Sequence, residues 1–437
     1  MKERKSELKE YEPIPQTFEI EGGKRLEGTI SAGGSKNAAF PVLAGAVLLD
    51  EPIQINNVPR INDVECFIEI LGEIGAQVER VGENSVKIDP RTIHTSKVPT
   101  ELGNKIRGSY YFLGALLSKF DNATIPQPGG CSIGERPMEQ HFIALEQLGF
   151  KFEDNGESTT GIKTTSTNEY SSITLPFPSR GTTINILLAA SLQDGHTTEI
   201  INYNKSPETL NLVDFLVKSG ASIDEYNDRI FITGRDRLVL DEFEVIPDKI
   251  EVATLLTAGL ITKGSVTVDN VHVPHVQIFL DKLNAIGFGY EVEDKKVTVR
   301  YKEGLALKPV DVISGLNLND IDADFEPILA ALLCTVQGDS KIQDDINPAR
   351  HSKYVPYLNS LGANITEDSQ IRATIHGGTS FKPGIGVAQD IRGGVSQMLA
   401  MLSTGGASYL SSISQIQRGY ENIDKKINKL GGKISRI

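Results

Sequence analysis

A cysteine in a loop rich in glycine and proline is the side chain best placed to do chemistry in this sequence. Cys131 stands in residues 126–137, which join an expected strand to an expected helix and offer a thiol little apolar cover. Free cysteines are usually buried as small hydrophobic side chains, and Cys66 and Cys334 fit that description because both lie in apolar helical stretches. Cys131 has Arg136 nearby, and a neighbouring cation lowers the pKa of a thiol. Two interpretations of Cys131 stay open: an ordinary buried cysteine, and a reactive or proton-donating one.

Two glycines precede a lysine at an expected helix start near the N-terminus. Gly33 and Gly34 are followed by Ser35, Lys36 and Asn37. Backbone N–H groups at a helix start, together with a lysine, suit the binding of phosphate or carboxylate. The spacing is not that of a P-loop. A glycine turn with an exposed lysine is the plainer interpretation.

Three alternating carboxylates precede an apolar helical stretch in the second part of the chain. Asp320, Asp322 and Asp324 could bind a metal, but the sequence lacks the glycine and terminal glutamate of an EF-hand. A helix N-cap is the usual structural explanation for Asp324, the last of the three. The functional alternative is a catalytic base at the start of a helix. His272 and His275 have no partner ligands nearby in the sequence, which favours a surface or capping role over a metal site.

Arginines recur beside glycines and expected helix starts in this acidic chain. The formal net charge of −13 argues against nonspecific binding to nucleic acid or to an anionic membrane. A single arginine is normally a solvated surface charge, but several in such loops suggest convergence on an oxyanion substrate. They are Arg107, Arg350, Arg392 and Arg418.

Six helical stretches that end on a glycine indicate how these loops are positioned. Each turns directly into what is expected to be a strand, and a helix that stops and reverses needs a residue that tolerates positive φ. The endings recur roughly every 70 residues, longer than a solenoid period, so each unit is expected to be a small α/β module. The glycines are Gly75, Gly149, Gly220, Gly287, Gly362 and Gly431.

Each module also carries an earlier helical stretch that is apolar on most faces. We expect these helices to be buried between sheets, whereas the second helix of each module, such as residues 63–74, should face solvent. The apolar stretches are residues 37–49, 108–120, 182–192, 252–261, 325–336 and 395–403.

Six such βαβαββ modules predict an α/β fold with two domains. A chain of 437 residues exceeds what one hydrophobic core normally holds. Three modules around a pseudo-threefold axis, with the apolar helices inside and the sheets outside, would make one inside-out barrel. We expect the first domain at residues 36–246, with the cysteine loop as a lid. The second should comprise residues 1–35 and 247–437, with a strand at residues 16–20 completing it.

Composition is that of an ordinary soluble protein, with 39% hydrophobic and 23% charged residues. Three scattered cysteines are too few for a disulfide framework or a zinc site.

Residues 1–12 lack the apolar core of a signal peptide. The longest apolar run, residues 38–49, contains Pro41 and is too short to span a bilayer. These features predict a cytoplasmic protein.

Taken together, these motifs resemble the enolpyruvyl transferase superfamily from about Phe18 to the C-terminus, in particular its branch acting on UDP-linked amino sugars. That resemblance implies two inside-out α/β barrels with the active site in the cleft between them. It also implies transfer of the enolpyruvyl group of phosphoenolpyruvate to the 3-hydroxyl of UDP-N-acetylglucosamine, with release of phosphate. The most specific signals are Lys36-Asn37-Ala38-Ala39, residues 129–134 with Arg136-Pro137, and Arg418-Gly419-Tyr420-Glu421.

The resemblance assigns an acid and a base to this reaction. The acid that protonates C3 of phosphoenolpyruvate is Cys131, because a thiol with a pKa near ~8.5 stays largely protonated at neutral pH. The base for the sugar hydroxyl is Asp324, with Asp320 the less favoured alternative.

The remaining residues that the resemblance implies bind the two substrates. Lys36, Arg136 and Arg418 match the clamp around the phosphate and the reacting carbon, and Arg392 matches the carboxylate contact. Arg350 corresponds to a cleft arginine and Asn37 to the residue that orients the sugar. Arg107, before a buried helix, is a further candidate for substrate binding. For the nucleotide, the matching residues are Pro137, Met138, Glu139, Ser179, Arg180 and Gly181. The chain departs from the family pattern at Glu139, Phe177 and Lys249, where many members carry Asp, Lys and Arg.

Two other functions stay open at this level. One is a paralogue that acts on another nucleotide-linked acceptor, and the other is a non-catalytic homologue. The shikimate-pathway relative is less favoured, because Lys36 is followed by Asn-Ala-Ala and because Cys131 is present. We expect no cofactor, no metal, no nucleic-acid or membrane partner, and a monomer.

Overall fold

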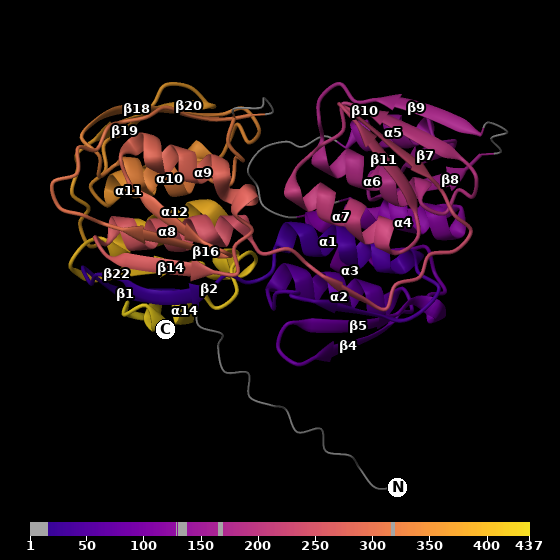
Figure 1. Cartoon of the computed structure of the whole chain (residues 1–437), viewed down its shortest axis with the longest axis horizontal. Coiled ribbons are helices and arrows are strands. Elements are labelled where there is room, and N and C mark those ends of the chain that lie inside the picture. Colours follow the sequence, from indigo (N-terminus) through magenta and orange to yellow (C-terminus); the bar gives the residue numbers. More distant parts are fainter. Residues whose placement is uncertain (1–15, 128, 130–137, 165–168, 316–319) are drawn as a thin grey trace, which may run out of the picture.

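The computed structural model describes residues 16–127, 129, 138–164, 169–315 and 320–437. Its buried hydrophobic side chains form two clusters, one spanning residues 38–245 and the other residues 18–32 together with 250–434. We call the parts that contain them the first half (residues 36–245) and the second half (residues 16–32 and 249–437). Figure 1 shows the halves side by side.

The chain crosses between the halves twice, at residues 33–35 and 246–248, and the two crossing segments hydrogen-bond to each other. The N–H of Ser35 donates to the carbonyl of Ile246 at 2.8 Å, and the N–H of Asp248 donates to the carbonyl of Gly33 at 2.8 Å. A Cβ on Gly34 would lie 1.7 Å from the carbonyl oxygen of Asn57, so only glycine fits there. These crossing segments place Lys36 and Lys249 at the junction of the halves.

Three sheets belong to the first half. Their strands are β3 (Ile53–Asn56), β4 (Gln77–Val81), β5 (Ser85–Asp89), β6 (Asn122–Pro126), β7 (Phe150–Asp154), β8 (Ser158–Lys163), β9 (Tyr170–Thr174), β10 (Thr197–Ile201), β11 (Ser222–Tyr226), β12 (Arg229–Thr233) and β13 (Glu242–Glu244). The strand orders are β13-β3-β5-β4, β6-β8-β7 and β11-β12-β10-β9.

Three more sheets belong to the second half. Their strands are β1 (Thr17–Gly22), β2 (Glu27–Ser31), β14 (Ser265–Asp269), β15 (Tyr290–Glu293), β16 (Lys296–Arg300), β17 (Val312–Ser314), β18 (Gly338–Asp344), β19 (Ile365–Glu367), β20 (Arg372–Gly377), β21 (Ile385–Val387), β22 (Gly406–Ser411) and β23 (Ile434–Arg436). The orders are β15-β16-β14-β2, β17-β18-β20-β19 and β21-β22-β1-β23. The prediction that an N-terminal strand joins the second half is confirmed, since β1 pairs antiparallel with both β22 and β23.

The prediction of four strands per module is wrong for one module. Among the described residues, five sheets have four strands, but the sheet β6-β8-β7 has three. A single parallel bridge between Lys97 and Thr124 stands where its fourth strand was expected. Pro99 follows two residues later, and a proline cannot donate to a strand ladder, which limits how far pairing can extend.

The six predicted apolar helices are present and lie against one another in two groups of three. In the first half, α1, α4 and α6 contact each other, and in the second half α8, α10 and α12 do the same. Every residue of α8 is buried, which a helix apolar on all faces requires. Their bounds are α1 (Lys36–Gly45), α4 (Tyr111–Phe120), α6 (Arg180–Ala190), α8 (Lys249–Ile261), α10 (Glu326–Leu333) and α12 (Ile391–Leu402).

A second helix in each module ends at one of the six predicted turn glycines. All six glycines have positive φ, from +88° at Gly149 to +109° at Gly220 and Gly287, so this prediction is confirmed. The helices are α2 (Asn62–Glu73), α5 (Glu139–Glu146), α7 (Pro207–Lys218), α9 (Val273–Ile286), α11 (His351–Ser360) and α14 (Ile423–Lys429). The short helices α3 (Thr100–Gly103) and α13 (Ser414–Gln417) complete the set described.

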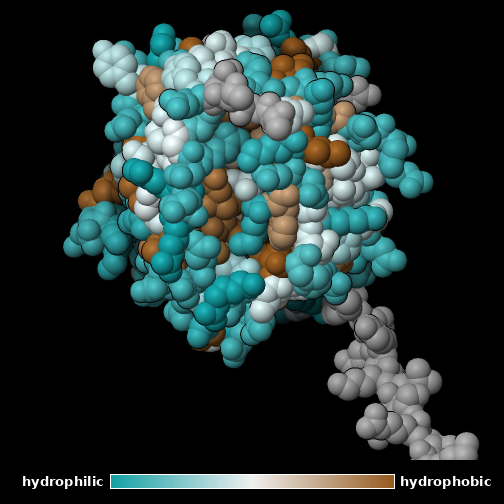
Figure 2. Space-filling view, turned by 90° about the vertical axis from the view of Figure 1, so that its right-hand side faces the viewer, coloured by the Kyte–Doolittle hydropathy of each residue, from teal (hydrophilic) through white to brown (hydrophobic). Residues whose placement is uncertain are grey.

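Hydrophilic side chains cover most of the face shown in Figure 2, which is the outer side of the first half, and apolar side chains appear there only in small groups. Among the described residues, none of the helices has both the length and the apolar character needed to cross a lipid bilayer.

Candidate active site

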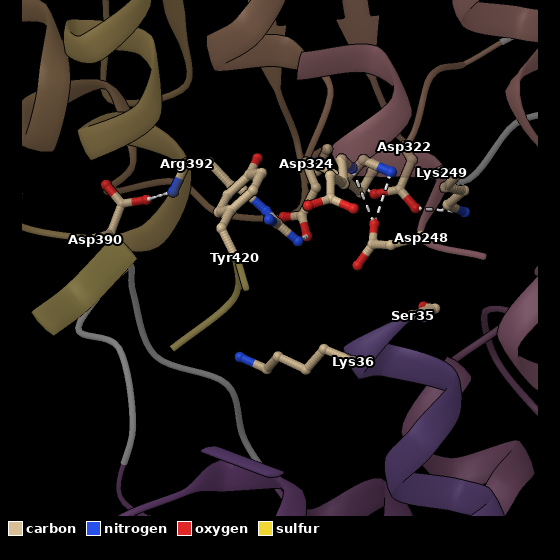
Figure 3. Close-up of polar contacts among 12 residues, drawn as sticks. Ser35, Lys36, Asp248, Lys249, Asp322, Asp324, Asp390, Arg392 and Tyr420 are labelled. Atoms are coloured by element: carbon tan, nitrogen blue, oxygen red, sulfur yellow. Dashed lines mark hydrogen bonds and ion pairs between the residues drawn. The ribbon is translucent and has the colours of Figure 1, made fainter. Parts of the chain in front are cut away.

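Lys36 is a buried lysine at the start of α1, not the exposed one of the plainer interpretation. Ser35 caps the helix, because its Oγ accepts from the N–H of Ala38 at 3.3 Å. The Lys36 residue is 9% exposed, and its Nζ donates to Oδ2 of Asp63 at 2.7 Å. Burial lowers the pKa of Lys36 below its ordinary value, against the opposing attraction of Asp63. The side chain projects towards the junction of the halves (Figure 3).

Asp63 is a site residue that the sequence did not reveal. Residues 63–74 were predicted to face solvent, which is wrong for Asp63, because it is 5% exposed. Its Oδ1 accepts from Nε of Arg418 at 2.7 Å, while its Oδ2 accepts from Lys36 and, at 3.4 Å, from Nη2 of Arg418. An acidic residue in the first turn of a helix is common, so no signal marked it. Asp63 therefore joins cations that come from opposite halves.

Arg392 lies in the first turn of α12 and points towards α10. Asp390 caps the helix, with Oδ1 accepting from the N–H groups of Arg392 and Gly393 at 3.0 Å each. The Arg392 guanidinium lies 5.1 Å from the centre of the Tyr420 ring (Figure 3), close enough for a cation–π contact. Its Nη1 is buried and has no hydrogen-bond acceptor among the described residues.

Asp324, just ahead of α10, is held by two arginines. Its Oδ1 accepts from Nη2 of Arg350 and its Oδ2 accepts from Nη2 of Arg392, both at 3.0 Å. Burial disfavours the ionised form, but the charges of Arg392 and Arg350 outweigh that effect and hold the pKa of the Asp324 carboxyl well below its usual range. Asp320, the alternative base, instead packs its carboxylate against Gly315.

The charges around Asp63 and those around Asp324 are neighbours, because residues 418–420 contact both groups. Arg418 binds Asp63, and the adjacent Gly419 lies so close to Arg392 that a Cβ there would be 3.5 Å from its Nη1. Tyr420 then packs under the same guanidinium. The structure thus brings Lys36, Asp324, Arg350, Arg392 and Arg418 into one region at the junction of the halves.

The nucleotide-binding candidates lie in the first half, at the starts of α5 and α6. Nη2 of Arg107 lies 3.3 Å from Sδ of Met138, and burial lowers the pKa of Arg107. Glu139 begins α5. Ser179 caps α6 by accepting from the N–H of Thr182 at 3.3 Å.

Six predicted site residues remain, of which three are described by the structure. Gly181 faces the ring of His141, because a Cβ there would be 3.0 Å from its Cε1. Arg180 points towards the second half and contacts Asp322. Asn37 is half-buried in α1. Cys131, Arg136 and Pro137 lie outside the described residues.

His141 beneath the α6 turn makes folding stability depend on pH. Its Nδ1 lies 2.9 Å from Nδ2 of Asn185, and burial, with a smaller contribution from Arg107, lowers its pKa to about 3. The unfolded chain therefore binds a proton near pH 6.5 that the native protein does not bind, and stability falls as the pH drops below that value. Between pH 7 and pH 5 this residue should cost about 2 kcal/mol of unfolding free energy.

The measurement is urea denaturation of the wild type and His141→Asn at both pH values. The variant should lose that part of the pH dependence, whereas His376→Asn, at a half-exposed position on β20, should keep the wild-type difference. An unchanged difference in the His141 variant would contradict the assignment. His275, whose pKa burial also lowers to about 4, contributes equally to all three proteins.

Comparison with known proteins identifies the family. A model of the EPSP synthase (3-phosphoshikimate 1-carboxyvinyltransferase) family matches residues 20–427. UDP-N-acetylglucosamine 1-carboxyvinyltransferase of Kosmotoga olearia is 36% identical over 416 residues, covering 95% of this chain and 97% of the relative. UDP-N-acetylglucosamine 1-carboxyvinyltransferase 3 of Caldanaerobacter subterraneus is 37% identical over 426 residues, covering 97% and 99%.

Solved structures share the fold. The enolpyruvyl transferase NikO from Streptomyces tendae superposes with a TM-score of 0.85 at 23% identity, covering 97% of this chain and 99% of that one. An EPSP synthase from Acinetobacter baumannii gives a TM-score of 0.73 at 17% identity, covering 96% and 99%. With a family match over nearly its whole length and curated relatives above one-third identity, the chain belongs to the EPSP synthase family of enolpyruvyl transferases.

Proposed function

We propose that this protein transfers the enolpyruvyl group of phosphoenolpyruvate to the 3-hydroxyl of UDP-N-acetylglucosamine and releases phosphate. Full-length relatives named UDP-N-acetylglucosamine 1-carboxyvinyltransferase support this function. The observation that carries it is the convergence of Lys36, Arg350, Arg392 and Arg418 from both halves on two carboxylates. Such a cluster of cations suits a small substrate with a phosphate and a carboxylate.

The reaction proceeds by addition and elimination. A proton added to C3 of phosphoenolpyruvate develops positive charge at C2, where the sugar hydroxyl adds as it loses its own proton. The resulting tetrahedral ketal phosphate loses phosphate and the proton from C3 to restore the double bond. In this proposal Cys131 is the acid, Asp324 is the base, and Lys36 and Arg418 stabilise the phosphate. The role of Cys131 rests on the family resemblance alone.

Arg392 is suited to the substrate carboxylate because it has a spare donor. Its Nη2 binds Asp324, whereas its buried Nη1 has no acceptor among the described residues. A buried donor without a partner costs free energy, and a bound carboxylate would satisfy it. A substrate anion that draws Arg392 from Asp324 would also remove one of the charges that depress the pKa of Asp324. Asp324 then becomes a stronger base when the substrate is bound.

We also infer that each half is an inside-out barrel, with the domains at residues 36–246 and at residues 1–35 with 247–437. The two separate buried clusters and the two groups of mutually contacting helices support this division. The cytoplasmic location and the monomeric state stay predictions.

A panel of acceptors tests the function directly. Phosphate release from phosphoenolpyruvate should require UDP-N-acetylglucosamine, while UMP and shikimate-3-phosphate should support little or none. Turnover with UMP in place of the UDP-sugar would favour a paralogue with another acceptor. Phe177, which is 42% exposed two residues before Ser179, is the observation that keeps that alternative open. Absence of turnover with every acceptor would favour a non-catalytic homologue.

A further inference from the structure

Two buried charges, Glu208 and Lys249, and two partly exposed ones, Arg180 and Asp322, meet where the first half contacts the second. The first half supplies Arg180 and Glu208, and the second half supplies Lys249 and Asp322. Nη2 of Arg180 lies 3.1 Å from Oδ2 of Asp322 and 3.7 Å from Oε2 of Glu208. Nζ of Lys249 lies 2.9 Å from Oδ2 of Asp322 and 3.2 Å from Oε1 of Glu208. We call these four residues the interface cluster; each of its cations contacts one carboxylate of its own half and one of the other.

This pairing lets the halves separate without leaving any of the four charges without a partner of opposite sign. On separation Arg180 keeps Glu208 and Lys249 keeps Asp322, so each half retains a neutral pair. An unpaired buried charge is the expensive outcome, and the alternating arrangement avoids it. Closure adds the contacts Arg180–Asp322 and Lys249–Glu208. The interface cluster therefore suits reversible docking of one half on the other.

Asp322 also holds the backbone of Asp324. Its Oδ1 accepts from the N–H of Asp324 at 3.0 Å, while its Oδ2 faces Arg180 and Lys249. Figure 3 shows Asp322 between Lys249 and Asp324. Arg180 itself is steadied from the first half, because its Nε donates to Oγ of Ser206 at 3.1 Å. A continuous set of contacts thus runs from the start of α6 to the proposed base.

We propose that Arg180 and Asp322 are positioning residues for the enolpyruvyl transfer, an inference that rests on the proposed function. Docking of Arg180 on Asp322 holds the Asp322 carboxylate against the amide of Asp324, and so sets the direction of the Asp324 carboxylate when the halves close. Neither residue touches the reacting atoms. Because Arg180 follows Ser179 at the start of α6, the orientation of the base is tied to the position of the half that carries this turn.

Kinetics of Arg180→Gln, Asp322→Asn and the double variant test the proposal. We expect kcat to fall by about 10- to 100-fold, since small misplacements of a catalytic group have effects of that size, while KM for phosphoenolpyruvate stays unchanged. The double variant should lose no more than the worse single variant, because both changes break one contact. Arg180→Lys keeps the charge and should restore most of the turnover. The control is Arg229→Gln, which breaks an ion pair with Glu199 inside the first half at 2.7 Å and should leave kcat unchanged.

A second measurement separates this proposal from the proposed function. Small-angle scattering of the ligand-free proteins should give a larger radius of gyration for Arg180→Gln and Asp322→Asn than for the wild type, Arg180→Lys or Arg229→Gln. The proposal would be overturned if Arg180→Gln kept the wild-type kcat, or if the losses of kcat in the double variant were additive. It would also be overturned if each loss of kcat matched a loss of thermal stability and Arg180→Lys did not restore turnover. If the wild type itself releases no phosphate, the proposed function fails. In that case the scattering still tests the contact between Arg180 and Asp322. An unchanged radius of gyration in Arg180→Gln would show that this contact does not hold the halves together.

Discussion

Replacing Asp324 by asparagine should lower kcat by about 10²- to 10⁴-fold, the range typical of lost acid–base catalysis. Asparagine keeps the size of the side chain and an acceptor oxygen for one of the two arginines that bind Asp324, but it cannot take a proton from the sugar hydroxyl. The measurement is phosphate release at saturating phosphoenolpyruvate and UDP-N-acetylglucosamine. Binding of UDP-N-acetylglucosamine, measured by calorimetry, should be largely retained.

Asp320→Asn is the matched comparison, because Asp320 is the alternative base in the same segment. Its kcat should stay close to that of the wild type. The opposite pattern, with a large loss in Asp320→Asn and a small one in Asp324→Asn, would move the role of base to Asp320. Since Asp324→Asn leaves Arg350 and Arg392 with less compensating charge, its unfolding free energy must be measured as well. A loss of activity that disappears when only the folded fraction is counted would not support a catalytic role.

Replacing Lys36 by glutamine should lower turnover by about 10²- to 10³-fold, the usual effect of removing one preorganised charge from an active site. Lys36 is nearly buried, shares Asp63 with Arg418, and has a pKa already lowered by burial. A bound phosphate would provide the counter-charge that offsets this burial. Steady-state kinetics should therefore show a fall in kcat together with weaker use of phosphoenolpyruvate.

Lys205→Gln is the control for loss of a lysine in the same half. Lys205 is exposed, packs over the ring of Tyr203 and donates to the carbonyl of Asn227, both in the first half. It should behave as the wild type. Wild-type kinetics in Lys36→Gln would contradict the clamp, whereas an equal effect of both lysine variants would indicate a general dependence on net charge.

The repeated architecture was predictable because its determinants are local. A glycine that ends a helix needs positive φ whatever surrounds it, and all six glycines have it. Helices apolar on most faces must be buried, and the six such stretches became α1, α4, α6, α8, α10 and α12. That the sheet containing β6 has only three strands in the described part of the chain was not predicted, because strand pairing depends on a partner segment and not on the strand alone.

The candidate site could be predicted only in part. Lys36, Asp324 and the arginines stood out because charged residues at helix starts beside glycines are unusual as a set. Asp63 did not, since an acidic residue in a first helical turn is ordinary. Its importance comes from Arg418, which lies 355 positions away in the chain.

By itself, the sequence determined the modules, the buried helices and the loops that carry charge, because helix propensity, apolar periodicity and turn glycines act over a few residues. Only the tertiary structure decided which charges share a partner. Arg180 and Asp322 are 142 positions apart and come from different halves. Their contact depends on how the two hydrophobic cores are set against each other, and no local pattern encodes that geometry.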